Sequence, residues 1–219
     1  MTTRPVGPLK VAGQVIDDPF AELEKYATWN DRTITRYDLP GPGDPGRLAL
    51  AEVERTKVIH SRIGGTEADW FVATAGTAPW AAVPGDAMLA DADPAEVGGL
   101  YDAATELYDW FRGRRGVSTA KISKVLHIKR PALVPILDSR LLKMYRVNAT
   151  EAGRRHAEHA RGAKRMYSAA IRDDLLEPGN VKVLAACRDQ IEGSDAEQVQ
   201  RLAGLSDVRL LDIVAWRMG

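Results

Sequence analysis

The chain has 219 residues, of which 45% are hydrophobic and 27% are charged, and its formal net charge is zero. This composition fits one globular domain with a substantial core and excludes a chain that is polybasic or polyacidic throughout. No apolar run of about 18 residues is present, and the N-terminus lacks the apolar stretch of a secretory signal. We therefore expect a single domain over residues 1–219, cytoplasmic, without membrane contact and monomeric by default.

The N-terminal part, residues 17–93, is predicted to hold helices separated by irregular segments. The expected helices cover 18–29, 48–63 and 66–71. The first begins at the capping pair Asp18-Pro19. Proline and glycine dominate Leu39–Gly46, which we interpret as a surface loop because its glycine spacing matches no phosphate-binding motif. Residues 73–93 are predicted to be irregular, with one extended piece at 80–83.

The strongest helical pattern opens the segment 94–146. Its apolar residues recur at helical spacing at Val97, Leu100, Tyr101, Ala104, Leu107, Tyr108 and Phe111. A connector with two glycines follows, and Ser118 or Thr119 then caps a second helix to about residue 128. This pattern predicts a helix-hairpin-helix motif over about 97–128. Asp138 is predicted to begin another helix, which ends at 146.

The C-terminal part, residues 150–219, also has helical patterns. We expect a long polar helix over 150–174, a break at 177–179, and helices over 181–192, 196–203 and 207–216. Because no strand pattern or repeat is visible, the prediction is an all-α, multi-helix bundle.

Cysteine and histidine usage argues against a metal centre. The single cysteine, Cys187, excludes an internal disulfide, a Cys-rich zinc site and a cysteine-ligated iron–sulfur cluster, and a buried structural thiol is expected. His156 and His159 share a predicted helical face, but no third ligand is evident. We therefore expect no metal and no other cofactor.

Positive charge is concentrated between Phe111 and Thr150. Ten of these residues are Lys or Arg and only one, Asp138, is acidic, which gives a local net charge of +9 in a neutral chain. Such a concentration of charge is typical of a surface that meets a polyanion. A solvated helical face is the alternative interpretation.

The stretch GVSTAKISKVLHIKRPALVPILDSRL, Gly116–Leu141, resembles the helix-hairpin-helix DNA glycosylases of base-excision repair. With the preceding helix, the resemblance covers about residues 97–145. It implies duplex DNA as the partner and Asp138 as the catalytic carboxylate, which would activate water and stabilise positive charge on the sugar while a base is turned out of the stack. From the residues alone, Asp138 also fits a plain helix N-cap.

The resemblance and the charge pattern together name a set of residues for nucleic-acid or phosphate binding. They are Arg114, Arg115, Gly116, Ser118, Lys121, Lys124, Lys129, Arg130 and Arg140. Trp80, in a loop, and His127, in the basic segment, are candidates for a base pocket, although both residue types are more often structural.

The chain departs from the family pattern at two positions. Ser118 replaces the second hairpin glycine, and Ala120 stands where bifunctional members carry a lysine nucleophile. Lys121 is one residue away, a turn of about 100° on a helix. We therefore expect monofunctional hydrolysis of an N-glycosidic bond. A non-catalytic DNA-binding or regulatory protein and a small-molecule or nucleoside-processing enzyme on the same scaffold are the alternatives.

Overall fold

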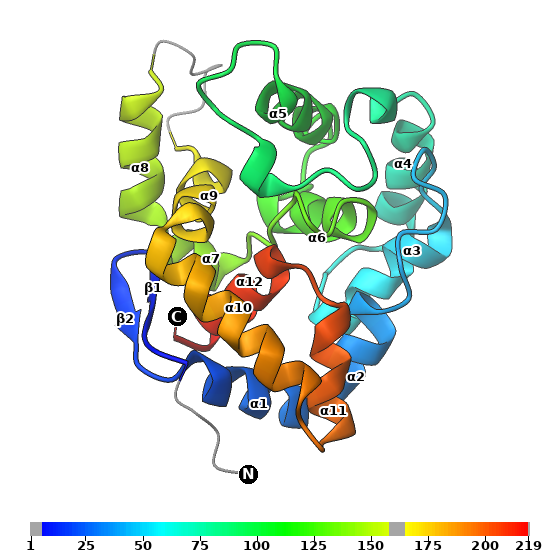
Figure 1. Cartoon of the computed structure of the whole chain (residues 1–219). Coiled ribbons are helices and arrows are strands. Elements are labelled where there is room, and N and C mark those ends of the chain that lie inside the picture. The colour runs from blue at the N-terminus through cyan, green and yellow to red at the C-terminus, as the bar shows by residue number, and fades with distance from the viewer. Residues whose placement is uncertain (1–5, 158–164, 219) are drawn as a thin grey trace.

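The computed structural model describes residues 6–157 and 165–218, and helices dominate them (Figure 1). The α-helices are α1 (Pro19–Trp29), α2 (Asp31–Thr33), α3 (Leu50–Arg55), α4 (Gly65–Ala75), α5 (Leu100–Trp110), α6 (Thr119–Lys129), α7 (Ser139–Met144), α8 (Arg146–Arg155), α9 (Tyr167–Leu176), α10 (Pro178–Glu192), α11 (Glu197–Gln200) and α12 (Asp207–Met218). The π-helical turn is η1 (Ile34–Asp38), and the 3₁₀ turns are η2 (Thr56–Ile59), η3 (Trp80–Ala82), η4 (Leu89–Asp91) and η5 (Arg201–Gly204). The prediction of an all-α, multi-helix fold is confirmed.

Helix α12 forms the centre of the molecule (Figure 1). Every residue from Val208 to Ala215 is buried, as expected for a helix that is covered on all sides. Helices α1, α7 and α9 pack against it. Two of its buried residues, Arg209 and Asp212, are charged, and both bond to other segments of the chain.

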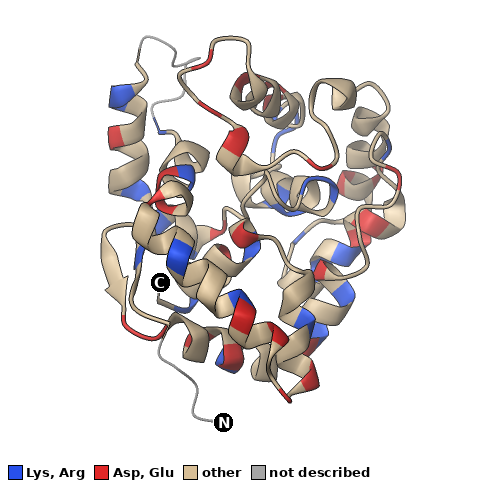
Figure 2. Ribbon diagram, in the orientation of Figure 1, with Lys and Arg blue, Asp and Glu red and all other residues tan. Residues whose placement is uncertain are grey.

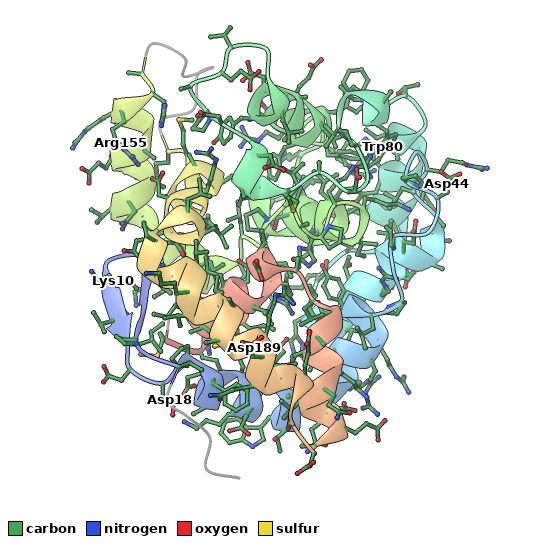
Figure 3. All side chains as sticks on the ribbon, in the orientation of Figure 1. Lys10, Asp18, Asp44, Trp80, Arg155 and Asp189 are labelled. Atoms are coloured by element: carbon green, nitrogen blue, oxygen red, sulfur yellow. The ribbon has the colours of Figure 1, made fainter. Side chains whose placement is uncertain are left out.

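A small β-hairpin, absent from the prediction, lies beside α10 (Figures 1 and 3). Strands β1 (Leu9–Val11) and β2 (Gln14–Ile16) pair antiparallel, with Leu9 opposite Ile16. The side chain of Asn180 accepts from the amide of Lys10 at 2.8 Å and donates to its carbonyl at 2.7 Å. Strands this short depend on such tertiary hydrogen bonds, so the local sequence pattern does not reveal them.

Several predicted elements differ from the structure. Helix α10 begins at Pro178, inside the break predicted at 177–179, and the piece predicted as extended at 80–83 contains the 3₁₀ turn η3. Helix α5 begins at Leu100 rather than near 94, because Gly98 adopts the left-handed conformation with φ of 75°. The helix predicted over 48–63 is α3 followed by η2, and it ends where His60 turns left-handed. The long helix predicted over 150–174 is instead two helices, α8 and α9, which pack against each other.

The proline- and glycine-rich loop at 39–46 is held by two cations from the end of α6. Lys129 Nζ donates to the carbonyl oxygens of Pro42 and Asp44 at 2.6 and 2.9 Å and pairs with Glu52 at 2.5 Å. Arg130 donates to the carbonyls of Pro45 and Val83 at 3.1 and 2.8 Å. Proline supplies no N–H, so the loop cannot pair its own carbonyls regularly, and buried side-chain donors replace the missing amides.

Replacing Lys129 by methionine should destabilise the fold. The Lys129 side chain is only 1% exposed, and its loss leaves Glu52 and two carbonyls without their donor. We expect the free energy of unfolding to fall by about 3 kcal/mol, measured by denaturant titration. The matched control is Lys143→Met, at an exposed position of α7, which should change it by less than about 0.5 kcal/mol. Equal effects of the two substitutions would contradict the anchoring role of Lys129.

Candidate nucleic-acid interface and the Asp138 site

The connector between α5 and α6 is an exposed turn that requires glycine. Gly116 has a φ of 89°, a conformation that other residues adopt only with strain, and it is exposed together with Arg112, Arg115 and Ser118. Ser118 is the N-cap of α6, and its hydroxyl accepts from the amide of Lys121 at 3.4 Å. The predicted cap is therefore present, and the connector is exposed, although the carbonyl of Gly116 accepts from Lys121 Nζ at 3.2 Å.

Arg114 and Lys121 fasten this connector to α4 instead of extending from it. Arg114 Nη1 donates to the carbonyl of Thr66 at 2.9 Å, and its guanidinium lies 6.0 Å from the centre of the Trp70 ring. Lys121 Nζ contacts both carboxylate oxygens of Glu67, at 2.6 and 2.7 Å. The hydrogen bond from Lys121 is the main cause of the lowered pKa of Glu67. Lys121 is thus committed to an ion pair on α4.

The other predicted phosphate-binding residues of α6 are turned further inward. Lys124 Nζ donates to the carbonyl of Ile59 at 2.7 Å, and burial lowers the pKa of this amine, against the opposing effect of Asp138. Lys129 and Arg130 are 0% and 1% exposed. The prediction that these two residues face phosphates is at odds with their burial. In the sequence, the two residues lie between Ile128 and the apolar run that follows Pro131. These apolar neighbours are a signal of burial that we overlooked when we counted charges.

Exposed cations remain on α7 and at the start of α8. Arg140, Lys143 and Arg146 are exposed. Arg140 lies 4.5 Å from the centre of the Trp216 ring, so it is held against the C-terminal helix. Figure 2 shows basic and acidic residues interspersed over elements throughout the molecule. The basic residues that are close together in the sequence therefore do not form one continuous positive surface in the fold.

Asp138 begins α7, as predicted, and its side chain is the N-cap. Oδ1 accepts from the amides of Arg140 and Leu141 at 2.9 and 3.0 Å. No hydrogen bond to Oδ2 is found among the described residues, and the residue is half-buried. One carboxylate oxygen therefore holds the helix, while the other is not committed to it.

The loop that precedes Asp138 is fixed on both sides. The amide of Leu137 donates to Ser123 Oγ on α6 at 3.0 Å, and the amide of Ile136 donates to Asp212 Oδ2 on α12 at 2.8 Å. The first bond sets Asp138 beside the middle of α6, about one turn beyond Ala120. Burial raises the pKa of Asp212 to about 7, against the opposing effect of Arg209.

Trp80 and His127, the predicted base-pocket candidates, are interior residues. Trp80 is 7% exposed, donates from Nε1 to the carbonyl of Ala75 at 2.8 Å and packs on Phe111, so its burial is at odds with a role in a base pocket (Figure 3). His127 stacks on Tyr37 with ring centres 6.0 Å apart. Burial lowers the pKa of His127 to about 3, so this imidazole is neutral.

A buried ion pair near His127 was missed by the sequence analysis. Arg209 Nε donates to Asp38 Oδ1 at 2.8 Å, and Nη2 donates to the hydroxyl of Tyr26 at 2.9 Å. Asp38 raises the pKa of Arg209 despite burial, so the guanidinium stays charged. The signal in the sequence was Arg209 inside the largely apolar stretch of α12, while nothing in the local pattern marked its partner Asp38.

The described residues contain neither a metal-binding cluster nor a membrane-spanning helix. His156 lies at the end of α8, whereas His159 is outside the described part of the chain. Within the described part, no group of three or more His, Cys, Asp or Glu residues is arranged to hold a metal ion. None of its helices combines the length and apolarity that crossing a bilayer requires.

Comparison with known proteins identifies one family, whose function is unknown. Residues 77–219 match DUF6308, which is described as a family of unknown function. No curated protein and no solved structure matches the chain. The matched region contains the connector, α6 and Asp138, whereas residues 1–76 lie outside it.

Asp212 should make stability depend on pH. Its pKa rises from 3.8 in the unfolded chain to about 7 in the fold, so folding takes up a proton between these values. Asp212 therefore makes the free energy of unfolding fall as pH rises through this window, whereas His127, with its pKa lowered from 6.5 to about 3, acts in the opposite direction. Asp212→Asn, which keeps an acceptor for Ile136, should therefore make the slope of the free energy of unfolding against pH more positive in denaturant titrations at several pH values. Asp207→Asn, at an exposed position of the same helix, should keep it, and an unchanged slope in Asp212→Asn contradicts the assignment.

Proposed function

The chain belongs to the DUF6308 family, and we propose that it binds duplex DNA through the α5–α6 connector and hydrolyses the N-glycosidic bond of a damaged base with Asp138. The resemblance of Gly116–Leu141 to the helix-hairpin-helix DNA glycosylases motivates the proposal. The observation that carries it is the position of the Asp138 carboxylate. It is fixed beside α6, with one oxygen in the helix cap and the other not bonded to a described residue.

In this proposal the connector meets the DNA backbone. Arg112 and Arg115 are exposed on it, and the open turn at Gly116 lets main-chain amides approach a phosphate. Ser118 adds a hydroxyl where the related proteins have glycine. The exposed cations of α7 and α8 contact the flanking phosphates. Lys129 and Arg130 do not take part, because they hold the loop at 39–46.

Asp138 then acts on a nucleotide that has been turned out of the stack. Its second carboxylate oxygen orients a water molecule and takes one of its protons, while the water oxygen bonds to the anomeric carbon of the sugar. The bond to the base nitrogen breaks, and the base leaves with the electron pair and is protonated from solvent. The negative charge of Asp138 stabilises the positive charge on the sugar as that bond lengthens.

Monofunctional hydrolysis fits the contacts of the nearby amines. Ala120 offers no nucleophile, and Lys121 is held by both oxygens of Glu67. Lys124 donates to the carbonyl of Ile59. Water is therefore the attacking group in the proposal, and no covalent intermediate with the protein is expected.

A second candidate is a DNA-binding protein without catalysis. The observation that favours it is the N-cap itself, because two amide hydrogen bonds to Oδ1 are a sufficient structural reason for an aspartate at this position. The same connector would bind the duplex. The two candidates differ only in what the charge of Asp138 does.

Duplex binding should depend on the connector cations. For Arg112→Ala/Arg115→Ala we expect roughly tenfold weaker binding to a fluorescent duplex at about 100 mM salt, and a log–log salt slope smaller by about 2, one per lost phosphate contact. Fluorescence anisotropy over a range of salt concentrations measures both.

The matched control for this variant is Lys25→Ala/Arg32→Ala, on α1 and α2. Lys25, like Arg112, is an exposed cation with an i,i+3 acidic partner. Figure 1 shows α1 and α2 at the end of the molecule opposite α5. The control should bind as the wild type does. Equal losses in both double variants, or no duplex binding at low salt, contradict the interface.

Asp138→Asn should separate capping from chemistry. Asparagine caps a helix as well as aspartate, so we expect the free energy of unfolding to change by less than about 0.5 kcal/mol. Asp138→Ala should lose about 1 kcal/mol with the cap. In a screen of duplexes with different base lesions, read by alkaline cleavage, Asp138→Asn should form abasic sites at least about 100-fold more slowly than the wild type, with DNA affinity retained.

The outcomes of this screen distinguish the two candidates. Abasic sites formed equally by the wild type and Asp138→Asn contradict the catalytic role of the carboxylate. Duplex binding without abasic sites on any lesion supports the non-catalytic candidate.

A further inference from the structure

A cavity of about 360 Å³ lies between the end of η1, the loop at 39–42, the C-terminal turn of α6 and the start of α12. Its size is at the lower end of the range for small-ligand sites, about 300–1,000 Å³. Asp138 and the α5–α6 connector do not line it. It is therefore a separate feature from the proposed DNA site.

The charged side chains in the cavity wall leave one positive charge uncompensated. They are Asp38, Arg55 and Arg209. Arg209 and Asp38 neutralise each other through their ion pair, in which the two side chains are only 8% and 1% exposed. His127, also in the wall, is neutral because burial lowers its pKa to about 3. Arg55 thus makes no direct ion pair among the described residues; burial lowers the pKa of its guanidinium, against the longer-range effect of Glu52 and Asp38.

Arg55 has a donor with no acceptor. Its Nη2 donates to the carbonyl of Gly41 at 2.9 Å, but its Nε is buried and has no hydrogen-bond partner among the described residues. A buried N–H without an acceptor costs free energy, and such a group calls for a specific explanation. Because Nε is buried, a ligand in the cavity does not reach it; Nη1, for which no hydrogen bond is found among the described residues, is the donor that remains for an oxygen anion.

The other polar groups of the wall are already engaged. Ser206 Oγ donates to the carbonyl of Pro131 at 2.7 Å, and the hydroxyl of Tyr37 donates to the carbonyl of Lys124 at 2.8 Å. His127 Nδ1 lies 2.7 Å from the carbonyl of Val134, so it carries the ring proton and Nε2 is an acceptor. The remaining wall is largely apolar, with Leu39, Ile128 and Leu205.

We infer that this cavity binds a small organic acid whose oxyanion, a carboxylate or a phosphate, pairs with Arg55 and whose body packs on the apolar wall. Charge complementarity selects an anion over a neutral molecule of the same shape. The half-buried guanidinium of Arg55 offers Nη1 for a charge-assisted hydrogen bond to the oxyanion. The site has no role in the proposed DNA chemistry, and its ligand is a free small molecule.

The test uses the 219-residue chain and three probes of similar shape. Benzoate and phenyl phosphate carry the two candidate oxyanions, and benzamide is the neutral control. In NMR titrations, we expect saturable shifts of the Arg55 Nε–H signal and of the Gly41 and Ser206 amides with at least one anion below about 10 mM, and binding of benzamide at least about tenfold weaker. The arm that binds more tightly identifies carboxylate or phosphate as the preferred group.

Arg55→Met should abolish this binding, with affinity reduced at least about 30-fold. The variant also removes the hydrogen bond to the carbonyl of Gly41, so its fold is checked by its amide NMR spectrum. Arg55→Lys, which keeps the charge but lacks the guanidinium, should bind with intermediate affinity and serves if the methionine variant unfolds. Arg47→Met, at an exposed position near the same loop, should bind as the wild type does.

Three results overturn the inference. They are no saturable shift with either anion, equal affinity for benzamide, and wild-type affinity in the Arg55 variants. The first means that the cavity takes up no small ligand, and either of the others means that the charge of Arg55 does not select the ligand. Duplex binding by Arg55→Met, measured in parallel, should be unchanged, so failure of this site is distinguishable from failure of the proposed DNA interface.

Discussion

The side chains of Lys129 and Arg130 connect the two halves of the sequence, and the rest of the structure depends on the direction in which they point. They extend from the end of α6 into the protein and donate to carbonyls of residues 42–45 and 80–83. Residues 42–45 are rich in proline and glycine and lack regular backbone pairing, and residues 80–83 hold only the short 3₁₀ turn η3. The buried cations therefore donate the hydrogen bonds that backbone amides donate in helices and strands, and they fix the N-terminal segments against α6.

Arg209 is a third buried cation that joins distant segments of the chain. Arg209, on the central helix α12, pairs with Asp38 and donates to Tyr26, so it joins the C-terminal helix to the N-terminal elements. A buried ion pair of this kind contributes little net stability, but loss of one partner leaves a costly charge. The pair also forms part of the wall of the cavity next to Arg55. The cavity wall thus contains Arg209, which is paired with Asp38, and Arg55, which makes no ion pair within the described part of the chain.

These contacts change the meaning of the positive charge in the sequence. The basic segment looks like one continuous surface for a polyanion, but its members divide into three groups in space. Lys129 and Arg130 are interior, Lys121 and Lys124 are bonded to neighbouring elements, and Arg115 with the cations of α7 and α8 is exposed. The proposed DNA interface is therefore narrower than the charge count indicates, and it centres on the connector rather than on the length of α6.

Helix N-caps could be predicted from the sequence alone, because they depend on local hydrogen bonds. Asp18, Ser118 and Asp138 each cap the helix that they were predicted to begin, because a cap bonds to amides two or three residues away. Only the tertiary structure decided where charged side chains go, since the acceptors of Lys129 lie more than 70 residues away in the chain. The burial of Trp80 and the cavity beside Arg55 likewise follow from distant segments that meet. No periodicity encodes such meetings, because they depend on how whole helices pack.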